Sequence, residues 1–241
     1  METPPKGPFY PLESQRSFER ISARIKEAIV DGTLQVGERL PSEAELASSF
    51  AVSRQTIREA LRTLEQTGFL GAPRKGAMGG TTVQNTIAEA IGGLFVDAIN
   101  MESVSVDELN VARKAIEDVI VGFAIENADE EDYRLLQENI AESGAQIVAG
   151  GISKDADLEF HRLVARASKN PVFEVVADAI LCVMQGILAR NPPTPTMSQR
   201  AVESHKLFLA AMRNRDAELG RKVMLEHLQE VHMYIKDVAE S

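Results

Sequence analysis

Residues 38–70 read ERLPSEAELASSFAVSRQTIREALRTLEQTGFL, and this stretch predicts two helices joined by a tight turn. Pro41 breaks the chain, and Ser42 follows it with the S-x-x-E spacing of a capping box to Glu45. Ser53 is a second N-cap candidate, placed shortly after the apolar end of that first helix. A short helix, a turn and a second helix are the elements of a helix-turn-helix.

The second of these helices, over about 54–66, has two distinct faces. Its apolar residues recur at i, i+3, i+4 and i+7 and predict a stripe that packs on the first helix: Ile57, Ala60, Leu61 and Leu64. Arg54, Arg58 and Arg62 recur at i, i+4 and i+8, so they line another face. In a helix-turn-helix such a face meets DNA, where arginine binds phosphates or guanine edges. The alternative is an αα-hairpin with a solvated basic face.

The distribution of charge favours DNA binding at this end of the chain. The 241 residues carry a formal net charge of −10. Residues 1–84, however, hold 11 Lys/Arg and 10 Asp/Glu, whereas residues 85–241 hold 15 and 26. An acidic body with a locally basic patch directs that patch toward DNA and keeps the other end away from it.

Composition bounds the compartment and the class of protein. The single cysteine, Cys182, excludes an internal disulfide and fits a reducing compartment. It lies in an apolar helical run, which predicts a buried, inert thiol. We find no apolar run long enough to span a membrane. Residues 1–16 have neither an apolar h-region nor an arginine-rich amphipathic pattern, so we interpret them as a flexible leader of a cytoplasmic protein.

A β-hairpin is predicted directly after the helix-turn-helix. Strand candidates at 69–72 and 80–83 flank a glycine-rich tip over 73–79. The tip carries Arg74 and Lys75, which suit contacts to the minor groove or to phosphates. An ordinary surface hairpin is the alternative, but the position after a recognition helix favours a wing.

The rest of the chain predicts helices alone. One helix over 17–31 precedes the helix-turn-helix, so the first domain spans 17–84. Beyond a junction at 84–86 the helical period recurs at 86–100, 105–127, 129–148, 153–168, 170–190, 197–213 and 215–238. We therefore expect a mainly α protein. A winged helix-turn-helix is followed by an all-α bundle of about six to seven helices over 87–240.

Three histidines and one aspartate predict a metal site in the helical bundle. Asp157 and His161 are i and i+4 on one helix, so they share a face. His205 and His227 lie on the last two helices at similar distances from a turn near Asn214, which brings them to a similar height. One carboxylate and three imidazoles suit Zn, Ni or Mn, with positions left open for water or a ligand. The alternative is a set of ordinary polar or core histidines.

The first domain resembles a known family. Residues 17–84 resemble the winged helix-turn-helix of GntR-family bacterial transcription regulators, through G-x-R-L-P-S-E-x-E-L-A (37–47), V-S-R-x-T-I-R-E-A-L-x-x-L (52–64) and G-G-T-x-V (79–83). The resemblance implies DNA contacts from polar residues of these motifs, to which the wing adds two cations: Arg39, Ser42, Ser53, Arg54, Gln55, Thr56 and Arg58, with Arg74 and Lys75. Many members carry arginine where this chain has Ala44, which puts one phosphate or base contact in doubt.

The second domain resembles the FCD-type helical effector domain of the FadR branch of that family. The supporting runs are A-R-K-A-I-E (112–117), D-L-E-F-H-R-L-V-A-R-A-S-K-N-P (157–171), E-S-H-K (203–206) and M-L-E-H-L (224–228). The resemblance implies that Asp157, His161, His205 and His227 bind a divalent metal. It also implies that Arg113 grips the carboxylate of an effector, a task suited to a bidentate guanidinium. The alternative for Arg113 is an i,i+4 ion pair with Glu117, and the two readings are compatible.

These features predict a metabolite-responsive transcriptional regulator and not an enzyme. We expect a homodimer that binds a palindromic operator in double-stranded DNA, one half-site per protomer, and senses a small organic acid. The resemblance implies a repressor. One rival is a helical-bundle metalloenzyme that uses the Asp/His3 site, but no general base of the H-E-x-x-H type lies nearby. Another is an architectural DNA-binding protein without an effector, for which the acidic half is larger than dimerisation requires.

Overall fold

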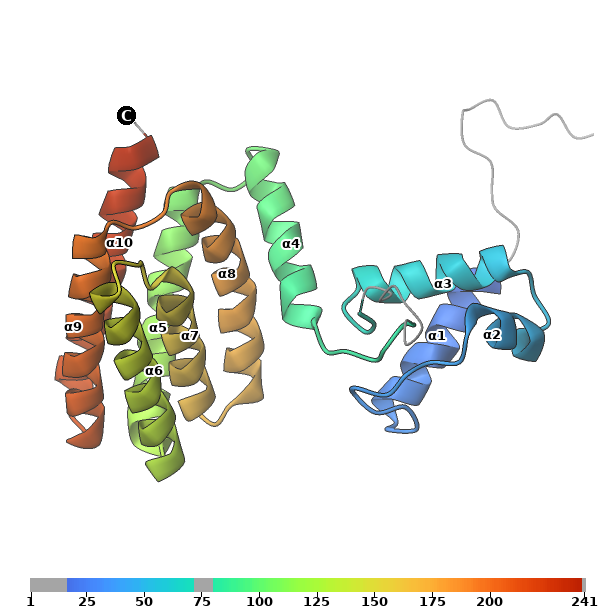
Figure 1. Cartoon of the computed structure of the whole chain (residues 1–241), viewed down its shortest axis with the longest axis horizontal. Helices are drawn as coiled ribbons and strands as arrows, with labels where there is room; N and C mark the ends of the chain where they lie inside the picture. The colour runs from blue at the N-terminus through green and yellow to red at the C-terminus, as the bar shows by residue number, and fades with distance from the viewer. Residues whose placement is uncertain (1–16, 72–79, 240–241) are drawn as a thin grey trace, which may run out of the picture. The chain divides into compact units, whose positions relative to one another are not determined.

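The computed structural model describes residues 17–71 and 80–239, and the chain divides into two compact units, Met1–Ile87 and Ala88–Ser241. Every regular element in the described ranges is an α-helix (Figure 1). The helices are α1 (Ser17–Val30), α2 (Glu43–Phe50), α3 (Arg54–Gln66), α4 (Ile87–Asn100), α5 (Val106–Asn127), α6 (Glu130–Val148), α7 (Lys154–Ala167), α8 (Pro171–Arg190), α9 (Pro195–Arg213) and α10 (Ala217–Ala239). The predicted fold class is confirmed, and the helix bounds agree with the expected ones to within about two residues.

The first unit is organised by α3, which packs against both α1 and α2. The predicted capping box of α2 is present, with the Ser42 side chain and Glu45 bonded reciprocally to each other's backbone N–H. Ser53 caps α3 by accepting a hydrogen bond from the backbone of Thr56. The apolar stripe of α3 is buried as expected, with Ile57 fully inaccessible. The exposed face of α3 is therefore fixed by the packing of its opposite face.

The strand prediction for this unit is wrong in extent. Within the described residues the segments 69–72 and 80–83 form no strand, and they contribute to two isolated antiparallel bridges, Leu70 with Val83 and Arg39 with Thr82. The two segments still pair briefly, because the backbone N–H of Gly71 donates to the carbonyl of Thr82 at 2.9 Å and that of Gln84 donates to the carbonyl of Phe69 at 3.0 Å. The backbone N–H of Leu70 instead donates to the carbonyl of Leu64 at the end of α3, at 3.3 Å. The predicted hairpin tip lies in 72–79, outside the described residues.

The second unit is a helical bundle with α7 at its centre. Helix α7 packs against α5, α6, α8 and α9, while α10 lies against α5 and α9 (Figure 1). The core beside α7 includes Phe160, Leu136 and Val121, each fully inaccessible. Because four helices surround it, α7 can present side chains to several neighbours at once, and two of the predicted metal ligands lie on it.

Helix α8 corrects one expectation from the sequence. Its span, Pro171–Arg190, is long and apolar enough to cross a membrane by length and composition. The expectation that the chain has no apolar run of that length is therefore wrong. The helix contributes Ile180, Leu181 and Leu188 to a buried cluster with Leu158 of α7. The core helix of a soluble protein passes the same test of length and composition.

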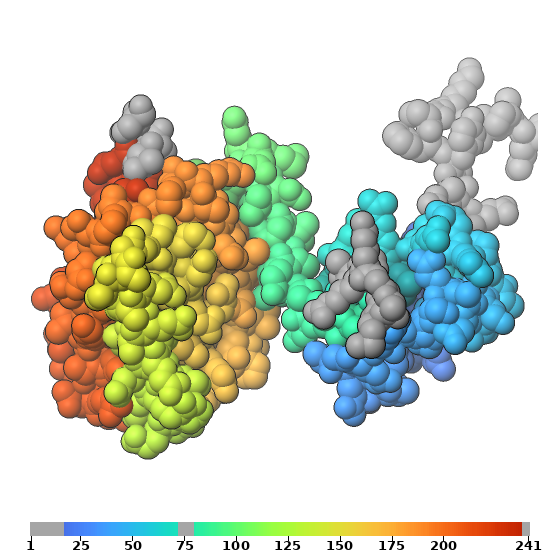
Figure 2. Space-filling view, viewed as in Figure 1, coloured from blue at the N-terminus to red at the C-terminus, as the bar shows by residue number. Residues whose placement is uncertain are grey.

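Helix α4 lies alongside α8, as both Figure 1 and Figure 2 show. The contact requires a glycine, because a Cβ at Gly92 would lie 2.7 Å from Cβ of Cys182 and 2.8 Å from the carbonyl oxygen of Ala179. Cys182 is therefore half-buried between two helices rather than fully buried as expected. Burial raises the pKa of its thiol, which keeps it protonated and unreactive at neutral pH.

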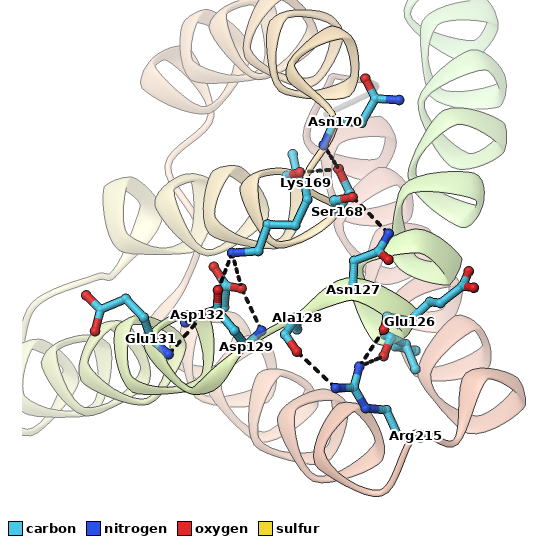
Figure 3. A network of polar contacts seen from close by, with 12 residues as sticks. Glu126, Asn127, Ala128, Asp129, Glu131, Asp132, Ser168, Lys169, Asn170 and Arg215 are labelled. Atoms are coloured by element: carbon cyan, nitrogen blue, oxygen red, sulfur yellow. Dashed lines mark hydrogen bonds and ion pairs between the residues drawn. The ribbon is translucent and has the colours of Figure 1, made fainter.

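A polar network holds together three helix junctions of the second unit (Figure 3). Lys169, which follows α7, reaches the carboxylates of Asp129 at 2.9 Å and Asp132 at 2.6 Å at the start of α6. Arg215, between α9 and α10, donates to the carbonyls of Glu126 and Ala128 at 2.9 Å at the end of α5. The connections between these helices are thus held by ion pairs and by hydrogen bonds to backbone carbonyl oxygens.

Candidate nucleic-acid interface and metal centre

The N-terminal turn of α3 presents the polar residues expected to meet DNA. Arg54, Gln55 and Arg58 are exposed, in line with the prediction for this face. The hydroxyls of Ser53 and Thr56 lie 2.9 Å apart, so the cap is held by two side chains. A helix N-terminus with free N–H groups and two neighbouring guanidinium groups favours a phosphate.

Arg58 is not free in solution but is held by a carboxylate from the other helix of the motif. Its Nε donates to Oε2 of Glu43 on α2 at 2.8 Å, with 62% and 40% of the two side chains exposed. The Nε of Arg58 is thereby occupied by Glu43. The sequence prediction assigned no role to Glu43, since residues 15 positions apart have no periodic relation.

Arg39 and Ser42 occupy defined positions close to this face. Arg39 forms a bridge to Thr82, and a side chain at Gly80 would collide with its guanidinium. Ser42 uses its hydroxyl within the capping box, where it donates to Oε2 of Glu45 at 2.7 Å. Ala44 is exposed. The two wing cations of the prediction, Arg74 and Lys75, lie outside the described residues.

The four predicted metal ligands come together in the interior of the second unit. Asp157 and His161 project from successive turns of α7, His205 from α9 and His227 from α10, and one ligand atom from each lies within 4.8 Å of the others. Oδ1 of Asp157 is 3.5 Å from Nε2 of His205 and 3.6 Å from Nε2 of His227. Nε2 of His161 is 3.2 Å from Nε2 of His227.

These separations fit the ligand set of a single cation. Bonds of about 2.1 Å place neighbouring ligand atoms roughly 3.0–3.4 Å apart. Oδ1 of Asp157 and both ring nitrogens of His205 are buried without a hydrogen-bond partner in the described structure. A buried polar atom without a partner costs about 1–3 kcal/mol. A cation bound among these atoms would remove that cost for Asp157 and for one nitrogen of His205.

The protonation of the histidines also suits a cation. Burial lowers the pKa of His205 well below its ordinary value, and the neighbouring imidazoles His227 and His161 lower it further. Burial likewise lowers the pKa of His227 to about 4. Both rings are therefore neutral at neutral pH, which is the form that coordinates metals.

Glu117 is the residue of this site whose role the sequence prediction missed. Its Oε2 lies 2.6 Å from Nδ1 of His161, and its Oε1 accepts from Nε of Arg113 at 2.6 Å. Burial alone would raise the pKa of Glu117, but its contacts with His161 and Arg113 lower it below the ordinary value. The i,i+4 spacing predicted the pair with Arg113, and no local signal predicts the contact with His161, 44 positions away.

Arg113 and Phe160 complete the surroundings of the four ligands. Arg113 is buried, with 3% of its surface exposed, and its guanidinium pairs with the same Glu117 carboxylate that contacts His161. Phe160 stacks on His205 with ring centroids 3.6 Å apart and planes inclined by 8°. The fourth histidine, His232, lies outside the cluster and pairs with Asp107 at 3.1 Å.

A small cavity reaches the cluster at Asp157. It lies among the first turns of α7 and α9, the end of α8 and one turn of α10, and Arg113 does not line it. Its wall is formed by Ser153, Lys154, Asp157, Leu188, Pro193, Met197, Ser198, Ala201 and Val231. A small molecule in this cavity would touch the same aspartate that faces the histidines.

Comparison with known proteins assigns both halves of the chain. Residues 18–79 match the gntR family of bacterial regulatory proteins, and residues 108–230 match the FCD domain. The chain belongs to the GntR family. It is a transcriptional regulator with an FCD effector domain rather than an enzyme, which excludes the metalloenzyme alternative. GntR regulators bind operator DNA, and FCD domains bind small-molecule effectors.

Relatives of known name resemble this GntR chain over almost its full length. YcbG of Bacillus subtilis (strain 168), an uncharacterised HTH-type transcriptional regulator, is 31% identical over 223 residues, covering 88% of this chain and 86% of that protein. The HTH-type transcriptional repressor NanR of Salmonella schwarzengrund is 25% identical over 227 residues, covering 92% and 85%.

Solved structures carry the same fold. The GntR protein of Streptococcus agalactiae matches with a TM-score of 0.63 and 25% identity, covering 89% of this chain and 98% of that one. McbR/YncC of E. coli matches with a TM-score of 0.53 and 21% identity, covering 94% and 100%.

Proposed function

We propose that this GntR-family chain is a cytoplasmic repressor that binds a palindromic operator as a homodimer and responds to a small carboxylate at a divalent metal site. The observation that carries the proposal is the convergence of one aspartate and three histidines, in which Oδ1 of Asp157 and both ring nitrogens of His205 are buried without a hydrogen-bond partner in the described residues. Such a set offers a site for Zn, Ni or Mn, and open coordination positions would receive an oxygen of the effector.

The DNA-binding half of the proposal rests on the first unit. Arg54, Arg58 and Gln55 are exposed at the start of α3, with Thr56 and the N-cap Ser53 beside them. Helix α3 would enter the major groove by this end, while Arg39, Ser42 and the wing cations Arg74 and Lys75 would contact the backbone. The relative NanR is named a repressor, which supports the same direction of regulation here.

The sensing half rests on the second unit. Asp157, His161, His205 and His227 would hold the cation, which would supply Lewis acidity toward an oxygen of the bound acid. Glu117 would orient His161 through the contact with its Nδ1, and its other carboxylate oxygen accepts from Arg113. Arg113 remains our expected contact for an effector carboxylate, in a guanidinium whose Nε is already taken by Glu117.

Exposed apolar side chains on α4 support a homodimer. Leu94 is 69% exposed and Phe95 39% exposed on a helix that is apolar along most of its length. Figure 2 shows this helix at an edge of the second unit. A second copy of the chain is the occupant we expect, because a palindromic operator requires two heads.

The proposal is tested by binding to the promoter region of the protein's own gene. We expect the full-length protein to bind this DNA, Arg54→Ala with Arg58→Ala to lose at least about 100-fold in affinity, and Arg134→Ala with Arg190→Ala to bind as the wild type does. Removal of metal with a chelator should abolish the response of DNA binding to organic acids. A chain that copurifies with no metal, takes up none and gains no thermal stability from any acid would overturn the sensing half.

A further inference from the structure

One of the four candidate metal ligands lacks the hydrogen bond that usually fixes the orientation of such a histidine. Metal-bound histidines almost always donate their second ring N–H to a carboxylate, a carbonyl or water. His161 follows this rule, because its Nδ1 lies 2.6 Å from Oε2 of Glu117. His205 does not follow it, since both of its ring nitrogens are buried without a hydrogen-bond partner in the described residues. Another contact must therefore hold the ring of His205.

The side chain of Phe160 supplies that contact. Its ring lies parallel to the ring of His205, with centroids 3.6 Å apart and planes inclined by 8°. Phe160 is fully inaccessible to solvent and His205 is 2% exposed, so the stack belongs to the interior of the bundle. The imidazoles of His161 and His227 meet His205 at steep angles instead, 89° and 67°. The plane of the His205 ring is thus set by the face of Phe160.

The stack follows from the same spacing on two neighbouring helices. Phe160 is three residues after Asp157 on α7, and Phe208 is three residues after His205 on α9. Residues at i and i+3 share a helix face, and α7 packs against α9. The ring of Phe208 meets the edge of Phe160, with centroids 5.8 Å apart and planes inclined by 80°. Two metal ligands and two phenyl rings therefore share one helix interface, but only Phe160 stacks on an imidazole.

The near-complete overlap of the two rings favours a charged imidazole. Two neutral aromatic rings prefer an offset or edge-to-face arrangement with centroids about 4.5–7 Å apart, because both ring faces are negative. A centroid distance of 3.6 Å leaves almost no room for an offset, since carbon atoms pack at about 3.5–4.0 Å. A positive charge, in contrast, is attracted to the face of a phenyl ring. An imidazole gains positive charge when one of its nitrogens ligates a cation.

We propose that Phe160 is a positioning residue of the metal centre, whose ring face holds His205 and attracts its imidazole more strongly once that imidazole ligates the metal. This assignment rests on the metal site proposed above. Because the attraction increases on metal binding, Phe160 contributes to metal affinity as well as to the core. It does for His205 what the carboxylate of Glu117 does for His161, with a ring face in place of an anion.

Zinc affinity of the full-length protein, measured by competition with a chelator, tests the proposal. Phe160→Leu should weaken zinc binding about tenfold, because it removes the ring face and keeps an apolar side chain. Phe208→Leu is the matched control, since it removes a ring of the same buried cluster that pairs with Phe160 and not with a histidine. It should keep the wild-type zinc affinity. Thermal unfolding of the metal-free variants measures the loss of core packing, which should be similar for both.

A change in the charge of the ring face tests the electrostatic origin at nearly constant shape. Trifluorophenylalanine in place of Phe160 withdraws charge from the ring face and should weaken zinc binding about threefold or more. The same replacement of Phe208 should leave zinc affinity unchanged. A double-mutant cycle tests whether the effect acts through His205. In a His205→Ala protein, Phe160→Leu should cause no further loss of the residual zinc affinity.

The outcomes separate this proposal from the one on which it rests. Equal loss of zinc affinity in Phe160→Leu and Phe208→Leu, or a full loss from Phe160→Leu in the His205→Ala protein, overturns the role of Phe160 and leaves the metal site intact. An unchanged zinc affinity after fluorination of Phe160 overturns it as well. A wild-type protein that binds no zinc overturns the metal site itself, and the role of Phe160 with it.

Discussion

Nδ1 of His161 and Oε2 of Glu117 lie 2.6 Å apart in the interior of the second unit, although the two residues are 44 positions apart in sequence. An anion at this position holds the ring proton on Nδ1. The lone pair of Nε2 then faces Asp157, His205 and His227, as a metal ligand requires. The same carboxylate accepts from Arg113, so ligand orientation and the buried arginine are joined through one side chain.

Glu117→Gln should weaken zinc binding about 10- to 100-fold, because a neutral amide is a weaker acceptor for the ring proton. Competition with a chromophoric chelator measures the affinity, and thermal unfolding of the metal-free protein measures the structural cost. Glu126→Gln, an exposed change on the same helix, is the control. A loss of metal-free stability with unchanged zinc affinity would mean that Glu117 serves only as the partner of Arg113.

His205→Leu should make the metal-free protein more stable by about 1 kcal/mol, since a buried imidazole with neither nitrogen bonded is replaced by an apolar side chain. The same change should abolish stabilisation by zinc, which adds about 2.7 kcal/mol to the wild type at 100 times the dissociation constant. Chemical denaturation with and without zinc tests both statements. His232→Leu, outside the cluster, should keep the zinc effect. A His205→Leu protein that zinc still stabilises would contradict the proposed ligand set.

Glu43→Gln should raise affinity for non-specific DNA and yet reduce the ratio of specific to non-specific affinity about tenfold. Removal of a negative charge strengthens phosphate binding, whereas loss of the 2.8 Å contact releases the Arg58 side chain from its orientation. Fluorescence anisotropy on operator and scrambled fragments measures both. Glu59→Gln on α3 removes the same charge, and in the described part of the chain the Oε1 of Glu59 accepts a hydrogen bond from Gln55 at 3.4 Å. If both variants change the two affinities equally, Glu43 does not position Arg58.

Lys169→Met should lower the melting temperature at neutral pH, and the difference from the wild type should shrink in acid. The hydrogen bond from Lys169 and that from the backbone of Asp132 lower the pKa of Asp129 to about 2. Its folded pKa is therefore below its unfolded value. The stabilisation is fully present above about pH 4 and is lost as the pH falls toward about 2. The pKa of Lys169 is raised, so the contribution also disappears at high pH, above the ordinary lysine value.

Thermal unfolding at pH values from about 2 to 9 measures this difference. Lys222→Met, an exposed lysine of α10, is the matched control and should show no such pH dependence. A difference for Lys169→Met that is constant down to pH 2 would show that the ion pair with Asp129 does not contribute.

Local rules determined most of the helical architecture from the sequence. Capping boxes at Ser42 and Ser105 and the Asn170-Pro171 start of α8 depend only on residues within one turn, so periodicity and cap chemistry locate those ends. The strands predicted near Leu70 and Val83 are reduced, within the described residues, to a single bridge with two flanking backbone hydrogen bonds, and the length of such pairing is not set by residues within one turn.

The candidate metal centre depends on one feature that is local in the sequence and on several that are not. The i,i+4 spacing of Asp157 and His161 is a property of one helix, and it is visible in the sequence. The packing of α5, α7, α9 and α10 decides the rest. It brings His205 and His227 to Asp157 and His161, and it places Glu117 against His161. It also places Ser153 and Lys154 beside the same cavity. Helix packing is set by summed apolar burial over many residues rather than by any local pattern, so only the tertiary structure decides which polar side chains share an interior.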